Sequence, residues 1–315
     1  MIDLKVKQVV RDIKNLKIQG ASKVQEQAVK ALIELIEKDE SKHVKEFDKK
    51  LKENALLLLN SRPTEPKLRN IIRLVLKNMK IKINLIDKKS MVLKELLEFK
   101  KKDLQAKELI TKFGAELIQK NNVILTHCHS HRVEDILIKA HNQRKKFKVY
   151  CTETRPFFQG RITARNLVKA GLNVTLIVDN TTNSIMKEAD IFLTGADAIT
   201  STGNLINKIG TSLHSLSAKK NNTKHFTACT LSKFDPITLL GLQEPIEERN
   251  LKEVWDKPPK KLKIFNPVFD ETPNHQITGY ITEEGILSPQ AFVVKALTLT
   301  DLKTSNHLSK LINLK

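Results

Sequence analysis

The residues best suited to chemistry follow a short β-prone run, in the stretch ILTHCHSHR from Ile124 to Arg132. Three histidines alternate around Cys128, and an arginine follows them. Such neighbours favour the thiolate form of a cysteine, which is the form that acts as a base or a nucleophile. The stretch therefore predicts an activated thiol, a metal site or a site for a charged substrate.

The metal site is the weaker of these alternatives. On an extended backbone His127, His129 and His131 would share one face, and Cys128 would point to the other. Nothing elsewhere in the sequence supplies the spaced second pair of ligands that zinc sites use. We therefore predict no metal. A purely structural role, with a buried strand-end cysteine and histidines facing solvent, stays open on these residues alone.

Composition limits the class of protein. The chain has 315 residues and no apolar run near the roughly 20 residues that span a bilayer. The N-terminus MIDLKVKQVV lacks the layout of a secretion signal, so we expect a soluble, cytoplasmic protein without a membrane partner. Besides Cys128 there are Cys151 and Cys229, both at the end of an apolar run, which predicts buried structural thiols and no disulfide.

The formal net charge of +20 raises the possibility of a nucleic-acid partner. The lysines, however, are spread over nearly every helix-like segment, and aromatic residues make up only 5% of the chain. No RNA-binding aromatic motif is present. A solvated lysine-rich surface is the favoured explanation, and its field would still attract anionic small molecules.

The chain changes character near residue 118. Before it, apolar residues recur at three- and four-residue steps, which predicts helices over Val6–Leu16, Val24–Ile36, Val44–Leu58 and Val92–Ile118. After it, β-rich runs alternate with helix-like segments, and the runs are Val123–Thr126, Phe147–Cys151, Val174–Val178, Ile191–Thr194 and His225–Cys229. We predict an α/β protein with a helical domain over 1–118, including a long linking helix, and a Rossmann-like parallel-sheet domain over 119–315.

In such sheets ligands bind beyond the carboxyl ends of the strands. Asp197 follows the fourth run, in TGADAI, where it could form an acid/base pair with the thiol or simply cap a turn. Asn207 and Lys208 precede Gly210 and an expected helix start, a layout that suits phosphate, and Arg62 likewise precedes a helix beginning near Pro66. No GxGxxG follows the first run and no P-loop is present, so a nucleotide site of either kind is not favoured.

Together these segments resemble a known family. ILTHCHSHR, CTETRPFFQGRITA, VDN, ADIFLTGADAIT, TGNLINKIGT, LSKFDP and FNPVFDETP are similar to motifs of the ribose 1,5-bisphosphate isomerase branch of the initiation-factor-2B alpha/beta/delta superfamily. IQGASK and SRPT match on the amino-terminal side. The superfamily also contains methylthioribose-1-phosphate isomerases. Its fold implies a helical domain followed by a Rossmann-like domain.

The resemblance implies roles for individual residues. Cys128 would be the general base and Asp197 the acid, a pair that the regulatory subunits of the superfamily generally lack. Substrate would contact Gly20, Ala21, Ser22, Arg62, Ser130, His131, Arg132, Asn207, Lys208 and Lys233. One position departs from the family: Gln19 stands where an arginine is usual. Either Lys17 compensates for that lost phosphate contact or the substrate differs.

The implied activity is the conversion of α-D-ribose 1,5-bisphosphate to D-ribulose 1,5-bisphosphate in AMP salvage, without a cofactor. The resemblance also implies a homo-oligomer, either a dimer or a hexamer of three dimers, and a possible nucleotide activator. Two alternatives remain. One is a non-catalytic regulatory subunit that binds a translation factor or a nucleotide, and the other is a methylthioribose-1-phosphate isomerase. The second is less favoured, because Lys233 and Arg62 suit a second phosphate.

Overall fold

The structure, a computed structural model, describes residues 2–15, 17–18, 20–62, 65–244 and 246–299. These residues form two compact units. The first comprises the described part of 1–105 together with 236–243, and the second comprises 106–235 with the described part of 244–299.

The first unit is helical. Its helices are α1 (Leu4–Lys14), α2 (Ala21–Glu37), α3 (Val44–Leu59), α4 (Pro66–Asn78) and most of α5 (Leu85–Leu117), with the 3-10 helix η3 (Pro236–Leu240). Asp3 caps α1, because its side chain accepts hydrogen bonds from the backbone N–H groups of Lys5 and Val6. The apolar faces of the helices meet in one core, to which Leu32 and Leu58 belong. The predicted helical N-terminal region is confirmed.

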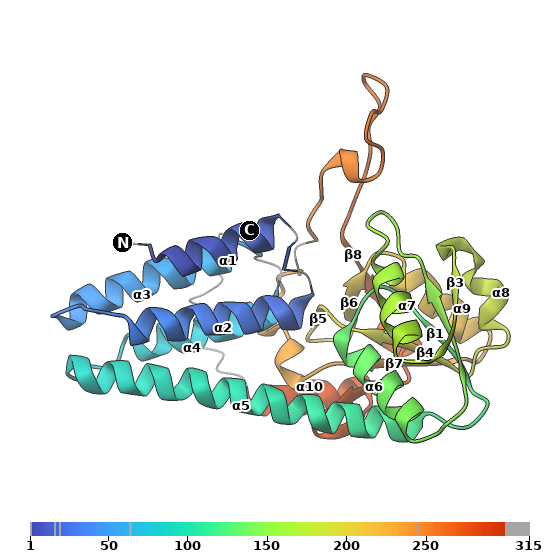
Figure 1. Cartoon of the computed structure of the whole chain (residues 1–315), viewed down its shortest axis with the longest axis horizontal. Helices are drawn as coiled ribbons and strands as arrows, with labels where there is room; N and C mark the ends of the chain where they lie inside the picture. The colour runs from blue at the N-terminus through green and yellow to red at the C-terminus, as the bar shows by residue number, and fades with distance from the viewer. Residues whose placement is uncertain (1, 16, 19, 63–64, 245, 300–315) are drawn as a thin grey trace. The chain divides into compact units, whose positions relative to one another are not determined.

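The second unit contains a seven-stranded sheet in the order β10-β9-β7-β4-β1-β2-β3, parallel except for the β9–β10 pair. Figure 1 labels β1, β3, β4 and β7 of this sheet. Its strands are β1 (Val123–Thr126), β2 (Lys148–Thr152), β3 (Asn173–Ile177), β4 (Ile191–Gly195), β7 (Lys224–Ala228), β9 (Gly279–Thr282) and β10 (Gly285–Leu287). A second, three-stranded sheet has the order β5-β6-β8, with β5 (Ala198–Ile199), β6 (Leu205–Lys208) and β8 (Phe269–Thr272). The five predicted strands match β1, β2, β3, β4 and β7 within one residue at each end.

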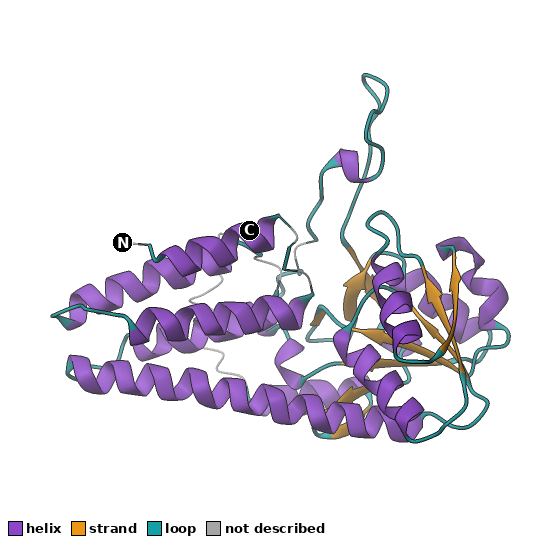
Figure 2. Ribbon diagram, viewed as in Figure 1, coloured by secondary structure: helices purple, strands orange, loops and turns teal. Residues whose placement is uncertain are grey.

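Helices flank the large sheet (Figure 2). They are α6 (His131–Asn142), α7 (Gln159–Lys169), α8 (Thr182–Met186), α9 (Thr211–Lys220) and α10 (Pro289–Thr298). Ile124 packs in the core that includes residues of α6 and α7, whereas its neighbour Leu125 packs in the core that includes residues of α8 and α9. Both side chains are fully buried. Burial on both faces is typical of a parallel sheet, and it explains why β1 is an apolar run.

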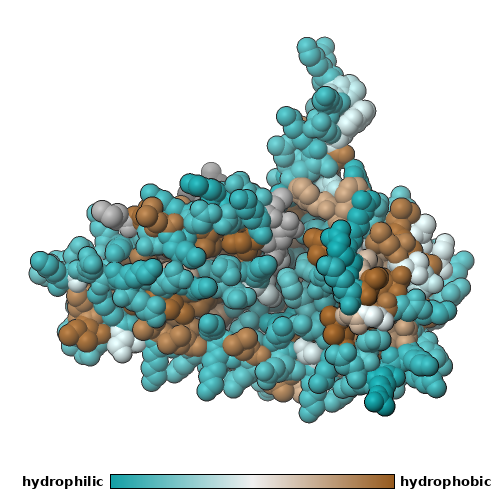
Figure 3. Space-filling model, in the orientation of Figure 1, coloured by the Kyte–Doolittle hydropathy of each residue, from teal (hydrophilic) through white to brown (hydrophobic). Residues whose placement is uncertain are grey.

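The predicted boundary at residues 118 and 119 lies just past the end of α5 at Leu117, whereas the two compact units divide within α5. That boundary stays a prediction. Among the described helices, none combines the length and the apolar character needed to cross a membrane. The face drawn in Figure 3 is mostly hydrophilic, with scattered apolar side chains.

Candidate active site

The point where the strand order reverses defines the site. From β1 the chain adds β2 and then β3 on one side, and it returns to place β4 on the other side of β1. Open α/β sheets bind ligands beyond the carboxyl ends of the strands at this point. Cys128 is the second residue after β1, and Asp197 is the second residue after β4. The two residues predicted to share the chemistry therefore follow neighbouring parallel strands.

Gly195, the last residue of β4, shows how closely the end of β4 approaches the segment that follows β1. A Cβ atom at this position would lie 2.7 Å from Oγ of Ser130. A glycine is needed here because the side chain of Ser130 occupies that space. The segment after β1 thus lies against the end of β4.

Cys128 is half-buried and has a left-handed backbone, with φ 68°. Its Sγ donates to Oε1 of Gln159 over 3.6 Å. Gln159 is the first residue of α7, and the positive end of a helix dipole favours a thiolate. Sequence reasoning did not single out Gln159, although it lies inside the quoted motif CTETRPFFQGRITA. The sequence does not show that α7 begins at Gln159, and this start of the helix places Gln159 next to Cys128.

Gly160 allows α7 to begin so close to β2. A Cβ atom on Gly160 would lie only 1.7 Å from the backbone oxygen of Thr152 and 3.0 Å from Oγ1 of Thr154. No side chain fits at this position without moving backbone. The glycine thereby sets the distance between the start of α7, with Gln159, and the end of β2.

Three predicted substrate contacts lie at the start of α6. Ser130 is the N-cap residue, and His131 and Arg132 are the first two residues of the helix. Arg132 is buried, and Ser130 and His131 are half-buried. The first N–H groups of a helix and its dipole attract anions. This end of α6 thus combines features that suit a phosphate group.

The remaining predicted contacts of this unit are buried. Asn207 and Lys208 end β6, and Lys233 ends the 3-10 helix η2 (Leu231–Lys233) after β7. The side-chain amide of Asn207 donates to Oγ1 of Thr211 over 3.0 Å, and Nζ of Lys208 lies 5.7 Å from the ring centre of Phe269. Lysines are rarely buried unless they have a specific partner or ligand.

The start of α9 differs from the prediction. Its N–H groups were expected to face phosphate, but those of Gly210 and Ser212 donate to the carboxylate of Asp270, over 2.7 Å and 3.2 Å. Burial raises the pKa of Asp270 to about 6, although these two hydrogen bonds oppose the rise. The chain thus caps α9 with its own carboxylate. Asp270 was quoted in FNPVFDETP, yet nothing in the sequence pairs it with Gly210.

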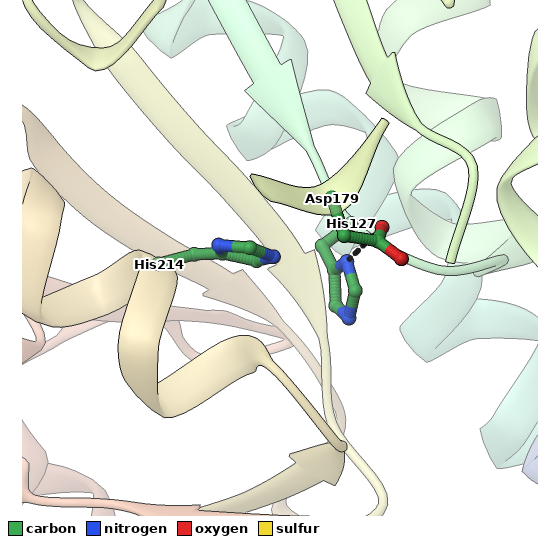
Figure 4. Close-up of side chains that lie close together, drawn as sticks. All are labelled: His127, Asp179 and His214. Carbon is green, nitrogen blue, oxygen red and sulfur yellow. Dashed lines mark ion pairs between the residues drawn. The ribbon is translucent and has the colours of Figure 1, made fainter. Parts of the chain in front are cut away.

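His127, Asp179 and His214 form a second polar cluster next to the site (Figure 4). One possible ligand atom from each lies within 4.8 Å of the others, as a metal site requires. Nε2 of His127 donates to the carbonyl oxygen of Ile209 over 2.9 Å, so Nδ1 accepts from Oγ1 of Thr152 over 2.7 Å. Burial lowers the pKa of His127 to about 4 and that of His214 to about 3, so both rings are neutral at pH 7.

Both oxygens of Asp179 are also engaged. Oδ1 accepts from the backbone N–H of Thr154 over 2.9 Å, and Oδ2 accepts from that of Arg155 over 2.8 Å. The 4.0 Å contact between Asp179 and His127, dashed in Figure 4, joins a carboxylate to a neutral ring. Because hydrogen bonds occupy both nitrogens of His127 and both oxygens of Asp179, we interpret the cluster as structural and not as a metal centre.

The three alternating histidines, His127, His129 and His131, do not share one face. The rings of His129 and His131 lie edge to face, 4.6 Å apart, and Nδ1 of His129 lies 3.1 Å from Oε1 of Glu134. His127 is directed instead to Thr152 and Ile209. The common face that the alternation suggested is therefore not formed by all three rings.

The last predicted residues belong to the helical unit. Gly20 is the N-cap residue of α2, with φ 79°, and Ala21 and Ser22 begin that helix. Arg62 lies before α4, with its Nε 4.0 Å from Oε2 of Glu65. Gln19 lies outside the described residues. A contribution of these residues to the site of the second unit stays a prediction.

Known proteins resemble this chain over most of its length. The model of the initiation factor 2 subunit family matches residues 17–289. The ribose 1,5-bisphosphate isomerase of Methanocaldococcus jannaschii is 41% identical over 287 residues, which cover 90% of this chain and 92% of that protein. The solved structure of a translation initiation factor eIF-2B from Pyrococcus horikoshii has a TM-score of 0.80 at 29% identity, covering 91% and 98% of the two chains. That of the 5-methylthioribose 1-phosphate isomerase from the same organism has a TM-score of 0.75 at 28% identity, covering 94% and 88%. The similarity thus includes both units.

Proposed function

Because the chain belongs to the initiation factor 2 subunit family, we propose that it is an aldose–ketose isomerase that converts α-D-ribose 1,5-bisphosphate to D-ribulose 1,5-bisphosphate. Relatives that carry the name ribose 1,5-bisphosphate isomerase support this substrate. The observation that carries the proposal is the placement of Cys128 and Asp197, which follow neighbouring strands β1 and β4 where the strand order reverses.

The reaction moves protons and needs no redox cofactor. Asp197 protonates the ring oxygen as its bond to C1 breaks, and the thiolate of Cys128 removes the proton from C2. The electron pair of the C2–H bond forms the C1–C2 double bond of an enol that keeps its C1 phosphate. A proton then reaches C1 from Cys128, while the C2 hydroxyl returns one to Asp197 and becomes the ketone. Both residues end as they began.

The cations and helix ends hold the two phosphates in this proposal. One phosphate binds at the start of α6, next to Ser130, His131 and Arg132. Lys208 and Lys233 are buried and so provide positive charge in a low dielectric, where it stabilises the enolate-like transition state more strongly than in water. A homo-oligomeric assembly, activation by a nucleotide and a role in AMP salvage belong to the same proposal.

A direct assay separates this proposal from its alternatives. Purified protein is given α-D-ribose 1,5-bisphosphate or 5-methylthioribose 1-phosphate, and the ketose product is quantified with AMP present and absent. We expect turnover of the bisphosphate, with a loss of at least about 1,000-fold in kcat for Cys128→Ser and Asp197→Asn. The control variants Cys229→Ser and Asp256→Asn should keep wild-type rates. Preference for the methylthio sugar, or turnover that survives both site variants, contradicts the proposal.

A further inference from the structure

Strained backbone is concentrated where β1 and β2 end. Cys128, Thr154 and Phe158 all have positive φ values, of 68°, 62° and 55°. Residues that carry a Cβ atom rarely adopt this conformation, and it persists only where surrounding contacts hold it. The contacts around Cys128 therefore have to compensate for the strain at the residue that bears the proposed base.

Two hydroxyl groups hold the backbone of Cys128 on either side. Its N–H donates to Oγ1 of Thr154 over 2.9 Å, and its carbonyl oxygen accepts from Oγ1 of Thr163 over 3.2 Å. The side chain of Thr154 is fully buried, so water does not replace its hydroxyl as the acceptor. The orientation of Cys128 thus depends on the position of Thr154.

Thr154 is held in turn by a carboxylate. Asp179, the second residue after β3, accepts the N–H groups of Thr154 and Arg155 with its two oxygens. Hydrogen bonds to an ionised acceptor are about twice as strong as neutral ones. A second set of hydrogen bonds holds the hydroxyl group of Thr154. Its Oγ1 lies 3.1 Å from Oγ1 of Thr152, which in turn donates to the neutral ring of His127.

We propose that Thr154 and Asp179 are positioning residues that hold Cys128 in its left-handed conformation and so direct its thiol toward the reacting carbon. The catalytic consequence rests on the proposed function, in which that thiol is the base. Asp179 acts through two backbone N–H groups, and Thr154 acts through one. Neither side chain needs to touch the substrate for this role.

Hydrogen exchange tests the hydrogen bonds without any substrate. Thr154→Val keeps the side-chain shape but removes the acceptor, and Thr154→Ser keeps the hydroxyl. We expect the Cys128 amide to exchange about fivefold faster in Thr154→Val, the factor that corresponds to one neutral hydrogen bond, and at the wild-type rate in Thr154→Ser. Asp179→Asn should speed exchange at Thr154 and Arg155, because an amide group offers only one acceptor oxygen.

Steady-state kinetics with α-D-ribose 1,5-bisphosphate tests the consequence. Thr154→Val and Asp179→Asn should lower kcat at least about tenfold with KM within about threefold of wild type, since a base moved by a fraction of an ångström loses rate before it loses binding. Thr154→Ser should restore kcat. Thr175→Val, on the exposed side of β3, is the matched control and should change neither exchange nor kcat.

Each outcome has one meaning. Faster exchange with an unchanged kcat overturns the positioning role. Unchanged exchange in both Thr154→Val and Asp179→Asn shows that the hydrogen bonds of Thr154 and Asp179 do not hold this backbone, and it overturns the proposal as a whole. If the wild-type protein does not turn over the bisphosphate, the proposed function fails, while the exchange rates still decide whether these residues hold Cys128.

Discussion

Replacing Gly160 by alanine tests whether the start of α7 lies as close to β2 as the site requires. The new Cβ atom would lie 1.7 Å from the backbone oxygen of Thr152. Contacts of this kind are essentially absent below 3.0 Å, so the atoms must separate by about 1.3 Å, the difference between 3.0 and 1.7. The obstacle is the main chain of β2 at Thr152, which pairs with β3 and cannot rotate away as a side chain can.

Overpacking against a rigid neighbour costs about 3 kcal/mol, near the upper end of the usual range. For a unit of about 200 residues, 1 kcal/mol shifts Tm by about 2 to 4 °C, so we expect Gly160→Ala to lower Tm by about 6 to 12 °C. The same displacement moves Gln159 away from the thiol of Cys128, so kcat should fall by at least about tenfold.

Gly285→Ala is the matched control. Gly285 has φ 106°, and a Cβ atom added to it would have no neighbour within 4 Å, so alanine there adds backbone strain of about 1 to 2 kcal/mol without a clash. Thermal unfolding followed by circular dichroism, together with kcat, compares the two variants. A Tm for Gly160→Ala equal to or above that of Gly285→Ala, with kcat unchanged, would refute the account of this contact.

Three further predictions concern the same site. Gly195→Ala places a Cβ atom against the side chain of Ser130 and should raise KM about three- to tenfold in steady-state kinetics, with Tm within about 3 °C of wild type. Gln159→Glu puts a carboxylate next to the thiol of Cys128, so the pH at which iodoacetamide modifies this cysteine should rise by about 1 unit, as mass spectrometry would show. Burial lowers the pKa of His127 to about 4 from about 6.5 in the unfolded chain, so the stability that its neutral ring contributes is present above pH 6.5 and is lost as the pH falls toward 4. Because burial also lowers the pKa of His214 and of His225, urea unfolding should show wild type losing about 2 kcal/mol more than His127→Gln between pH 7 and pH 5.

Local patterns were enough to predict five of the seven strands of the main sheet; β9 and β10 were not predicted. Burial on both faces of a parallel sheet produces short apolar runs, as in β1 and β4, whereas β3 at the edge of the sheet is largely exposed. The second sheet was missed, since β5 has two residues, Ala198 and Ile199, and β6 pairs with β8 more than 60 residues later in the chain. Periodicity within a short window carries no information about such distant pairing.

Only some of the contacts around the candidate site could be expected from the sequence. Cys128 and Asp197 could be proposed because strand ends meet at one edge of a parallel sheet. The contacts of Gln159, Asp179 and Asp270 could not, because each depends on where a distant backbone group lies. The sequence shows which side chains follow a strand, but the left-handed turn at Cys128 and its partners arise from tertiary packing.

The measurement that tests the central claim most directly follows deuterium from C2 of α-D-[2-²H]ribose 1,5-bisphosphate through the reaction in ordinary water. If Cys128 removes this atom as a proton, wild-type protein should release part of the deuterium to solvent, kcat should show a primary isotope effect, and Cys128→Ser should neither release it nor form ribulose 1,5-bisphosphate. Release of the deuterium by Cys128→Ser, or product formation by that variant near the wild-type rate, would contradict the account.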